Sequence, residues 1–177
     1  MKNFREEFQQ TTPLGFMNTV IYIRSEYMSL FTLSAANEYA RANDIETWVH
    51  LFLNGEGNNI VMSEELKKKK RYWLGPIEID IKYMERVVGP EKHLEYVEDI
   101  NWWNYNIDQI CNRLEAGWDM PPLIAENRNG NFKINDGNHR LGALQKLKRR
   151  KYYLIIWDDY SYENIINQLK NCGVNLK

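Results

Sequence analysis

The segment 121–147 constrains the fold of this chain more than any other part of the sequence. A short strand that starts at 121–125 and a return strand at 132–135 flank Asn129-Gly130, a pair that tolerates the positive φ angles of a tight hairpin turn. Gly137 and a run of leucines at helical spacing follow directly. A hairpin that continues into a helix requires a fold that mixes both kinds of secondary structure.

The patterns on either side of this segment supply further elements of both kinds. Ile77, Ile79 and Ile81 alternate with charged residues, which is typical of a half-buried strand. Helical spacing predicts two helices over about 26–54 and one over 102–116, the latter with a shared apolar face made of Trp103, Ile107, Ile110, Cys111 and Leu114. A strand at 152–157, a helix after Ser161 that Gly173 ends, and an irregular arm at 1–20 complete the α+β prediction.

Composition and missing motifs exclude several classes of protein. The 177 residues carry 23 Lys plus Arg and 24 Asp plus Glu, a net charge of -1, which argues against a general nucleic-acid-coating protein. No apolar run reaches the length of a membrane helix, and no apolar core of a signal peptide follows the N-terminus, so we expect a cytoplasmic protein. Two distant cysteines are expected to be reduced, and the three histidines lack zinc-ligand spacing. Walker A and GxGxxG motifs are absent.

The junction of strand and helix at 134–144 carries the strongest functional signal. Gly137 permits a tight turn, and the helix behind it begins with free amides and a positive dipole end that together favour an anion. His139 and Arg140 add donors suited to phosphate oxygens. Asp136 is a candidate to orient His139, to hold a magnesium ion or to act as a base. The plain alternative is an ordinary Asp-Gly turn in which Asp136 caps the helix.

Several stretches in sequence order resemble the ParB/sulfiredoxin-like superfamily. These are Pro121-Pro122-Leu123-Ile124, Asn129-Gly130, the run Ile134-Asn135-Asp136-Gly137-Asn138-His139-Arg140-Leu141-Gly142-Ala143-Leu144, and Tyr153-Leu154-Ile155-Ile156. The resemblance covers about 72–160. It implies a ParB/sulfiredoxin-like domain with a mixed sheet and flanking helices. The helical patterns outside this range add a helical N-terminal extension at 1–71 and a C-terminal helix and tail at 161–177.

The departures from the family pattern narrow the subfamily. Sulfiredoxins carry a reactive Cys where this chain has Asn138, which argues against sulfinic-acid repair. Partition ParB proteins carry Gly-Glu-Arg-Arg and a following DNA-binding helix-turn-helix, whereas only about 20 residues follow Trp157 here. The stretch 136–140 looks most like the Asp-Gly-His-x-Arg form of the free-serine kinases of this superfamily, with two positions altered.

This resemblance implies a nucleotide-binding protein, with magnesium-dependent phosphotransfer or nucleotide hydrolysis as its reaction and ATP, ADP or CTP as its cofactor. Gly137, Asn138, His139 and Arg140 are the expected phosphate-binding residues. Asp136, His139 and Glu91 are the expected catalytic residues. The kinases use a glutamate between the first strand and the long helix. Glutamates 85, 91, 95 and 98 lie in that region, and Glu91 is preferred because it directly follows Gly89-Pro90.

Two basic clusters support a rival interpretation. The runs 67–71 and 146–151 lie beside aromatic residues and are candidates to follow a nucleic-acid backbone, although such runs are more often solvated helix ends. The alternative function is therefore a noncatalytic nucleic-acid-binding or regulatory module. A third is a partner-binding scaffold that has lost its ligand. Trp102-Trp103 and Tyr105 form either an aromatic wall for a base or partner, or one core residue with a neighbour that covers another element.

Overall fold

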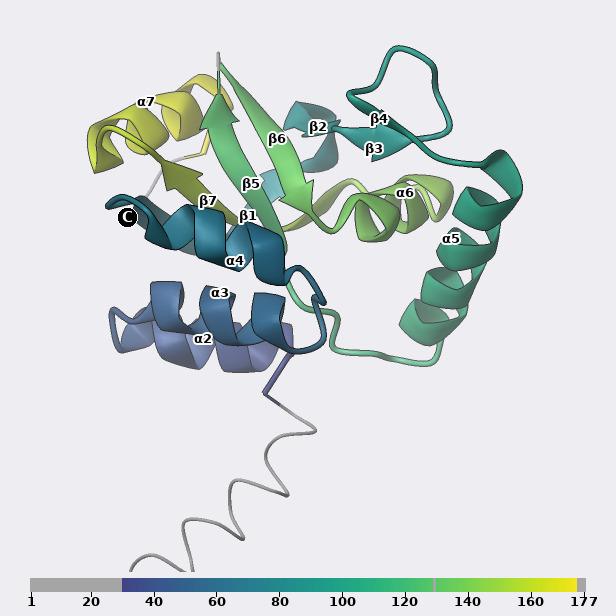
Figure 1. Cartoon of the computed structure of the whole chain (residues 1–177), viewed down its shortest axis with the longest axis horizontal. Helices are drawn as coiled ribbons and strands as arrows, with labels where there is room; N and C mark the ends of the chain where they lie inside the picture. Colours follow the sequence, from purple (N-terminus) through teal and green to yellow (C-terminus); the bar gives the residue numbers. More distant parts are fainter. Residues whose placement is uncertain (1–29, 129, 175–177) are drawn as a thin grey trace, which may run out of the picture.

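A computed structural model describes residues 30–128 and 130–174 of the chain. Its centre is a five-stranded mixed sheet in the order β1-β7-β5-β6-β2. The strands are β1 (Tyr72–Asp80), β2 (Met84–Arg86), β5 (Leu123–Arg128), β6 (Asn131–Asp136) and β7 (Lys151–Asp158). The helices around it are α2 (Leu33–Arg41), α3 (Ile45–Asn54), α4 (Ile60–Lys67), α5 (Ile100–Glu115), α6 (Asn138–Lys146) and α7 (Tyr162–Asn171). The predicted α+β class, with a mixed sheet and flanking helices, is confirmed (Figure 1).

The hairpin that anchored the sequence prediction is formed by β5 and β6. These strands pair antiparallel, and Gly130 in their turn has a φ of 80°. β7 then pairs with β5 in parallel and with β1 in antiparallel register, which makes β1 one edge of the sheet. β2 forms the other edge by pairing in parallel with β6. β2 lies in the long segment between β1 and α5, so its pairing attaches this segment to β6, the strand that leads into the candidate site.

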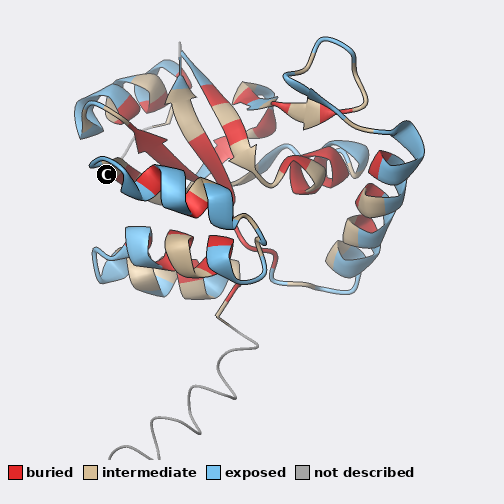
Figure 2. Cartoon of the chain, in the orientation of Figure 1, coloured by how far each residue is buried: buried red, intermediate tan, exposed pale blue. Residues whose placement is uncertain are grey.

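The two faces of the sheet are covered by different helices, because successive strand residues point to opposite sides. Leu154 and Ile156 of β7 pack into the core with α6 and α7. Ile155 and Trp157 pack instead with α2, α3 and α4, so these three helices share a core with the sheet. Figure 2 shows buried residues on the strands between both helical layers. α5 lies outside these layers and packs on α6.

Several predicted helix ends match the structure. α3 begins after Asp44 and ends at Gly55, but the Asp44 side chain makes no capping hydrogen bond. Ser161 does cap α7, because its hydroxyl accepts from the amide of Asn164. α5 begins two residues earlier than predicted, where Asp99 accepts from two amides of the first turn. The predicted irregular arm at 1–20 lies outside the described residues.

Three short strands had no clear signal in the sequence. They are β2, β3 (Val88–Gly89) and β4 (Tyr96–Val97), the last two paired with each other. A 3-10 turn, η1 (Ile81–Tyr83), connects β1 to β2, so the predicted alternation ends before Ile81. Cys111 and Cys172 are buried free thiols, and burial raises the pKa of each. None of the helices in the described ranges is both long and apolar enough to cross a membrane.

Candidate functional site

The residues 136–140 form a sharp turn from β6 into α6. Gly137 has a φ of 99°, a conformation that favours glycine. A Cβ at this position would lie 2.7 Å from Cδ2 of Leu123 and 2.9 Å from Nη2 of Arg140. The turn therefore requires glycine for its backbone and for the space that neighbouring side chains fill. Because glycine is also the N-cap, it offers no side-chain oxygen to the amides of the first helical turn.

Arg140, an expected phosphate ligand, is held by the protein itself. Its Nη1 donates to the backbone oxygens of Pro121 and Pro122 at 2.7 and 2.9 Å. Its Nη2 donates to the carboxylate of Asp136, and the guanidinium lies 5.1 Å from the ring centroid of Phe52. Only 9% of the Arg140 side chain and 11% of the Asp136 side chain are exposed. Through these contacts, Arg140 and Asp136 hold the turn against the residues that lead into β5.

Asn138 is likewise a structural residue. It is buried, and its Oδ1 accepts from the amides of Val87 and Val88 at 2.9 and 3.2 Å. Its Nδ2 donates to the backbone oxygen of Ile134 at 2.9 Å. The side chain thus ties the segment after β2 to the turn, and its polar atoms are engaged within the protein rather than by a ligand.

His139 is the residue of the turn whose side chain remains partly open to solvent. Its Nε2 lies 2.8 Å from an oxygen of Glu98, with 29% of the histidine and 27% of the glutamate side chain exposed. The imidazole packs on the indole of Trp103, with 4.6 Å between ring centroids. The structure therefore brings Glu98 to the turn; sequence reasoning included Glu98 among the region's glutamates but had no signal that favoured it.

Glu91, the glutamate preferred from the sequence, lies at the edge of this group. Its carboxylate pairs with Arg86, whose guanidinium lies 4.8 Å from the ring centroid of Trp103. Burial is the largest single influence on the pKa of Glu91 and would raise it, but the hydrogen bonds from Arg86 and from the backbone, together with the nearby positive charges, lower the pKa overall. Glu91 therefore reaches His139 only through Arg86 and Trp103, and the structure does not place it in contact with the turn.

All five residues of the turn line a single pocket. Its volume is about 260 Å³, and the walls are completed by the end of α3, the second half of α5 and the segment before β5: Phe52, Glu56, Gly57, Ile110, Arg113, Trp118 and Pro121. Arg113 is exposed, and its guanidinium lies 3.5 Å from the ring centroid of Trp118. Since Asp136 is neutralised by Arg140, Arg113 is the cation of this pocket that remains able to meet an anion.

The residues of the turn do not form a protein-built magnesium site. Asp136, the expected ligand, accepts from Arg140. Within residues 30–128 and 130–174, no group of three or more acidic, histidine or cysteine side chains is arranged to hold a metal ion. The donor set around the turn is instead one of amides and cations, which suits an anion.

The basic clusters named from the sequence are partly neutralised. In the run 67–71, four of the five cations pair with acidic residues at positions 64, 65 and 159. In the run 146–151, the first and last residues pair with Asp108 and Glu78. Among the aromatic residues, Trp103 is buried, whereas Trp102 is exposed and stacked on Tyr105 of its own helix with 6.1 Å between centroids.

Comparisons with known proteins find five matching chains among the solved structures, two of which follow. No protein-family model and no curated protein matches the sequence. A conserved hypothetical protein from Pyrococcus furiosus is similar at a TM-score of 0.38 and 20% identity, covering 50% of this chain and 34% of that one. A Pnob8-like ParB-N domain is similar at a TM-score of 0.36 and 16% identity, covering 61% of this chain and 41% of that one. A ParB-N domain is thus among the structures this chain is similar to. The chain spans less than half of either structure, and likeness at this level adds no argument about function.

Proposed function

We propose that this protein binds a nucleotide through its phosphate groups in the pocket at the start of α6. The observation that carries the proposal is that residues 136–140 line one pocket together with Arg113. The glycine cap offers no side-chain acceptor to the first-turn amides of α6, and the helix dipole adds positive potential at the same point. Backbone amides, Arg113 and His139 are therefore the phosphate donors, in place of Asn138 and Arg140.

The size of the pocket restricts how much of a nucleotide it encloses. Its volume of about 260 Å³ lies below the range of roughly 300–1,000 Å³ that is common for ligand pockets. We infer that the phosphates enter the pocket and that the base stays at its mouth, where Trp118 offers an aromatic surface. Glu98 beside His139 supplies an acceptor that could take a proton from a hydroxyl or water, which supports phosphotransfer or hydrolysis as the accompanying reaction.

The experiment is a thermal-unfolding panel with ATP, ADP, CTP and GTP, each with and without magnesium. A ligand present at about 100 times its Kd stabilises the folded state by about 2.7 kcal/mol, so binding raises the midpoint clearly. We expect one nucleotide to raise the midpoint of the wild type and Arg113→Gln to reduce that shift. Arg149→Gln is the matched control, because it removes the same charge from an exposed position outside the pocket.

The outcomes separate binding from turnover. If no nucleotide moves the midpoint of the folded wild type, the proposal is wrong. An equal loss of the shift in both arginine variants would show that overall charge, and not this pocket, attracts the nucleotide. Release of ADP or of inorganic phosphate in the same samples measures the reaction separately, so a protein that binds without turnover retains the first conclusion and loses the second.

A further inference from the structure

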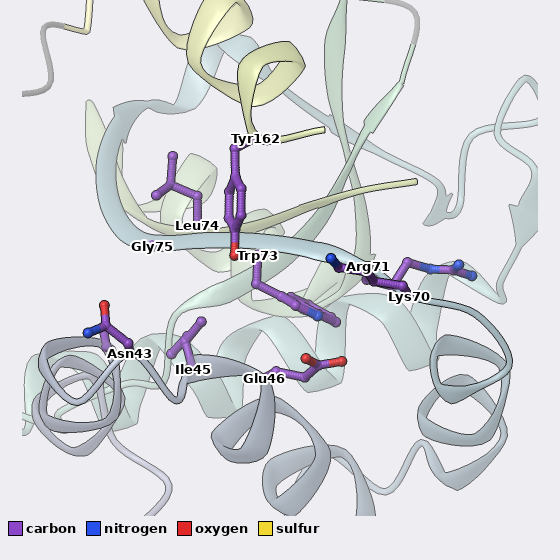
Figure 3. A pocket seen from close by; sticks show the side chains of 10 residues that line it. Asn43, Ile45, Glu46, Lys70, Arg71, Trp73, Leu74, Gly75 and Tyr162 are labelled. Atoms are coloured by element: carbon purple, nitrogen blue, oxygen red, sulfur yellow. The ribbon is translucent and has the colours of Figure 1, made fainter. Parts of the chain in front are cut away.

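A second pocket lies where the helices α2 and α3 meet the edge strand β1. Its volume is about 380 Å³, and it shares no lining residue with the pocket at α6. In Figure 3, Glu46 reaches from α3 and Tyr162 from the start of α7 towards Trp73 and Gly75 of β1. The remaining walls are mostly apolar: Ala40, Ile45 and Leu74, with Asn43 beside them.

Trp73 gives this pocket an unsatisfied buried donor. Trp73 is only 6% exposed, and its Nε1 has no hydrogen-bond partner among the described residues. Buried polar groups are nearly always paired, so such a donor indicates an acceptor that the protein does not itself provide. The volume of about 380 Å³ is many times the roughly 30 Å³ of one water molecule, so the space admits a small organic molecule as that acceptor.

Three charged side chains line the same pocket: Glu46, Lys70 and Arg71. Lys70 is the one cation of the run 67–71 without an acidic partner in the described part of the chain, whereas Arg71 is engaged by Asp159 at 2.9 Å and by the ring of Trp157. Glu46 lies 4.0 Å from Nε2 of His50. Burial and the nearby Lys67 lower the pKa of His50, so the neutral imidazole leaves the charge of Glu46 uncompensated.

We propose that this pocket binds a small zwitterion of the amino-acid class with an apolar side chain. The carboxylate of the ligand accepts from Lys70 and from Nε1 of Trp73, and its ammonium group donates to Glu46. The apolar side chain lies against Ile45 and Leu74. A simple anion would meet Glu46 and a simple cation would meet Lys70, whereas a zwitterion satisfies both charges and the indole.

The test follows the indole Nε1–H signal of Trp73 by NMR, assigned by triple resonance, in the full-length protein. L-leucine and L-phenylalanine are added up to roughly 10 mM, a range that detects millimolar Kd values. We expect a saturable shift of the Trp73 signal, with Kd raised about tenfold or more in Lys70→Met and in Glu46→Gln, because each variant removes one charge-assisted hydrogen bond. Lys68→Met is the matched control, since that lysine pairs with Glu65 and lies outside the pocket.

Two ligand controls separate the zwitterion from its parts. N-acetyl-leucine lacks the ammonium group and leucinamide lacks the carboxylate, so both must bind more weakly than leucine. If either binds as tightly as leucine, the zwitterion assignment is wrong. If neither amino acid moves the Trp73 signal in a saturable way, the pocket is not an amino-acid site. These results are independent of the nucleotide panel, because the two pockets have no lining residue in common.

Discussion

At the scale of single residues, Arg140 shows how a residue suited to phosphate can instead hold the site together. Its three donated hydrogen bonds join the turn to Pro121, Pro122 and Asp136. Arg140→Ala leaves the Asp136 carboxylate with little exposure and without its cation, so we expect a loss of about 3–5 kcal/mol in the free energy of unfolding. Urea unfolding measures this loss.

Two further variants make that measurement specific. Asp136→Asn keeps an oxygen that accepts from Arg140 and should cost less than Arg140→Ala. Arg113→Ala removes an exposed arginine and should change stability by less than about 1 kcal/mol. If Arg140→Ala lowers the free energy of unfolding no more than Arg113→Ala does, Arg140 is not a structural residue and is again a candidate phosphate ligand.

The sequence predicted the turn on which the candidate site is built but not the contacts of its residues. The turn at Gly137 and the helix behind it follow from local signals, and the structure has both. Apart from Asp136 and Ile134, each four residues away, the partners of Arg140 and Asn138 lie 18 to 51 residues away in the sequence, at Pro121–Pro122 and Val87–Val88. Long-range partners of this kind leave no local pattern, so a buried structural arginine and a free phosphate ligand look the same in the sequence.

At the scale of elements, α3 links the helical layer to the sheet through a partly buried histidine, His50. His50 Nδ1 lies 2.9 Å from Oγ of Ser63 in α4, and its ring meets the indole of Trp73 in β1 edge-on. Burial, and then Lys67, lower the pKa of His50 in the folded protein below its ordinary value of about 6.5. The unfolded chain therefore binds a proton more readily than the folded one as the pH falls.

Because the unfolded chain binds the proton more readily, the folded protein loses stability as the pH falls. The contribution of His50 to stability is complete above about pH 6.5 and is lost as the pH falls through the lower folded-state pKa. We expect urea midpoints to fall between about pH 6.5 and pH 5, above the range in which carboxylates titrate. His50→Gln should flatten this dependence, and His93→Gln, at an exposed position, should keep it. An unchanged slope in His50→Gln would assign the effect to other groups.

Elements with strong local patterns were predicted, and elements defined by pairing were not. The β5–β6 hairpin, α3, α5, α6, β7 and α7 each have a helical or strand pattern with a turn or cap residue at an end. β3 and β4 consist of two residues each and exist because they pair with each other. Such short strands contain too few residues to show a period, so only the three-dimensional structure identifies them.

At the scale of the whole molecule, the helices α2, α3 and α4 form one of the layers that cover the sheet. Their buried residues share a core with Trp73, Ile124, Ile155 and Trp157. The sequence predicted a domain at 72–160 behind a helical extension at 1–71. Because the shared core joins the two parts, cooperative folding is expected to involve both.

A shortened chain tests this expectation directly. A protein that begins at Tyr72 lacks all three helices and exposes Trp73, Ile124, Ile155 and Trp157 on one face of the sheet. Exposed apolar surface of this kind binds the dye ANS and is accompanied by loss of fixed side-chain packing. We expect the shortened chain to bind ANS and to unfold without a cooperative transition, whereas the full-length protein unfolds cooperatively and does not bind the dye. A shortened chain that unfolds cooperatively and leaves ANS unbound would show that 72–177 is an independent domain, with the helical layer as an addition to it.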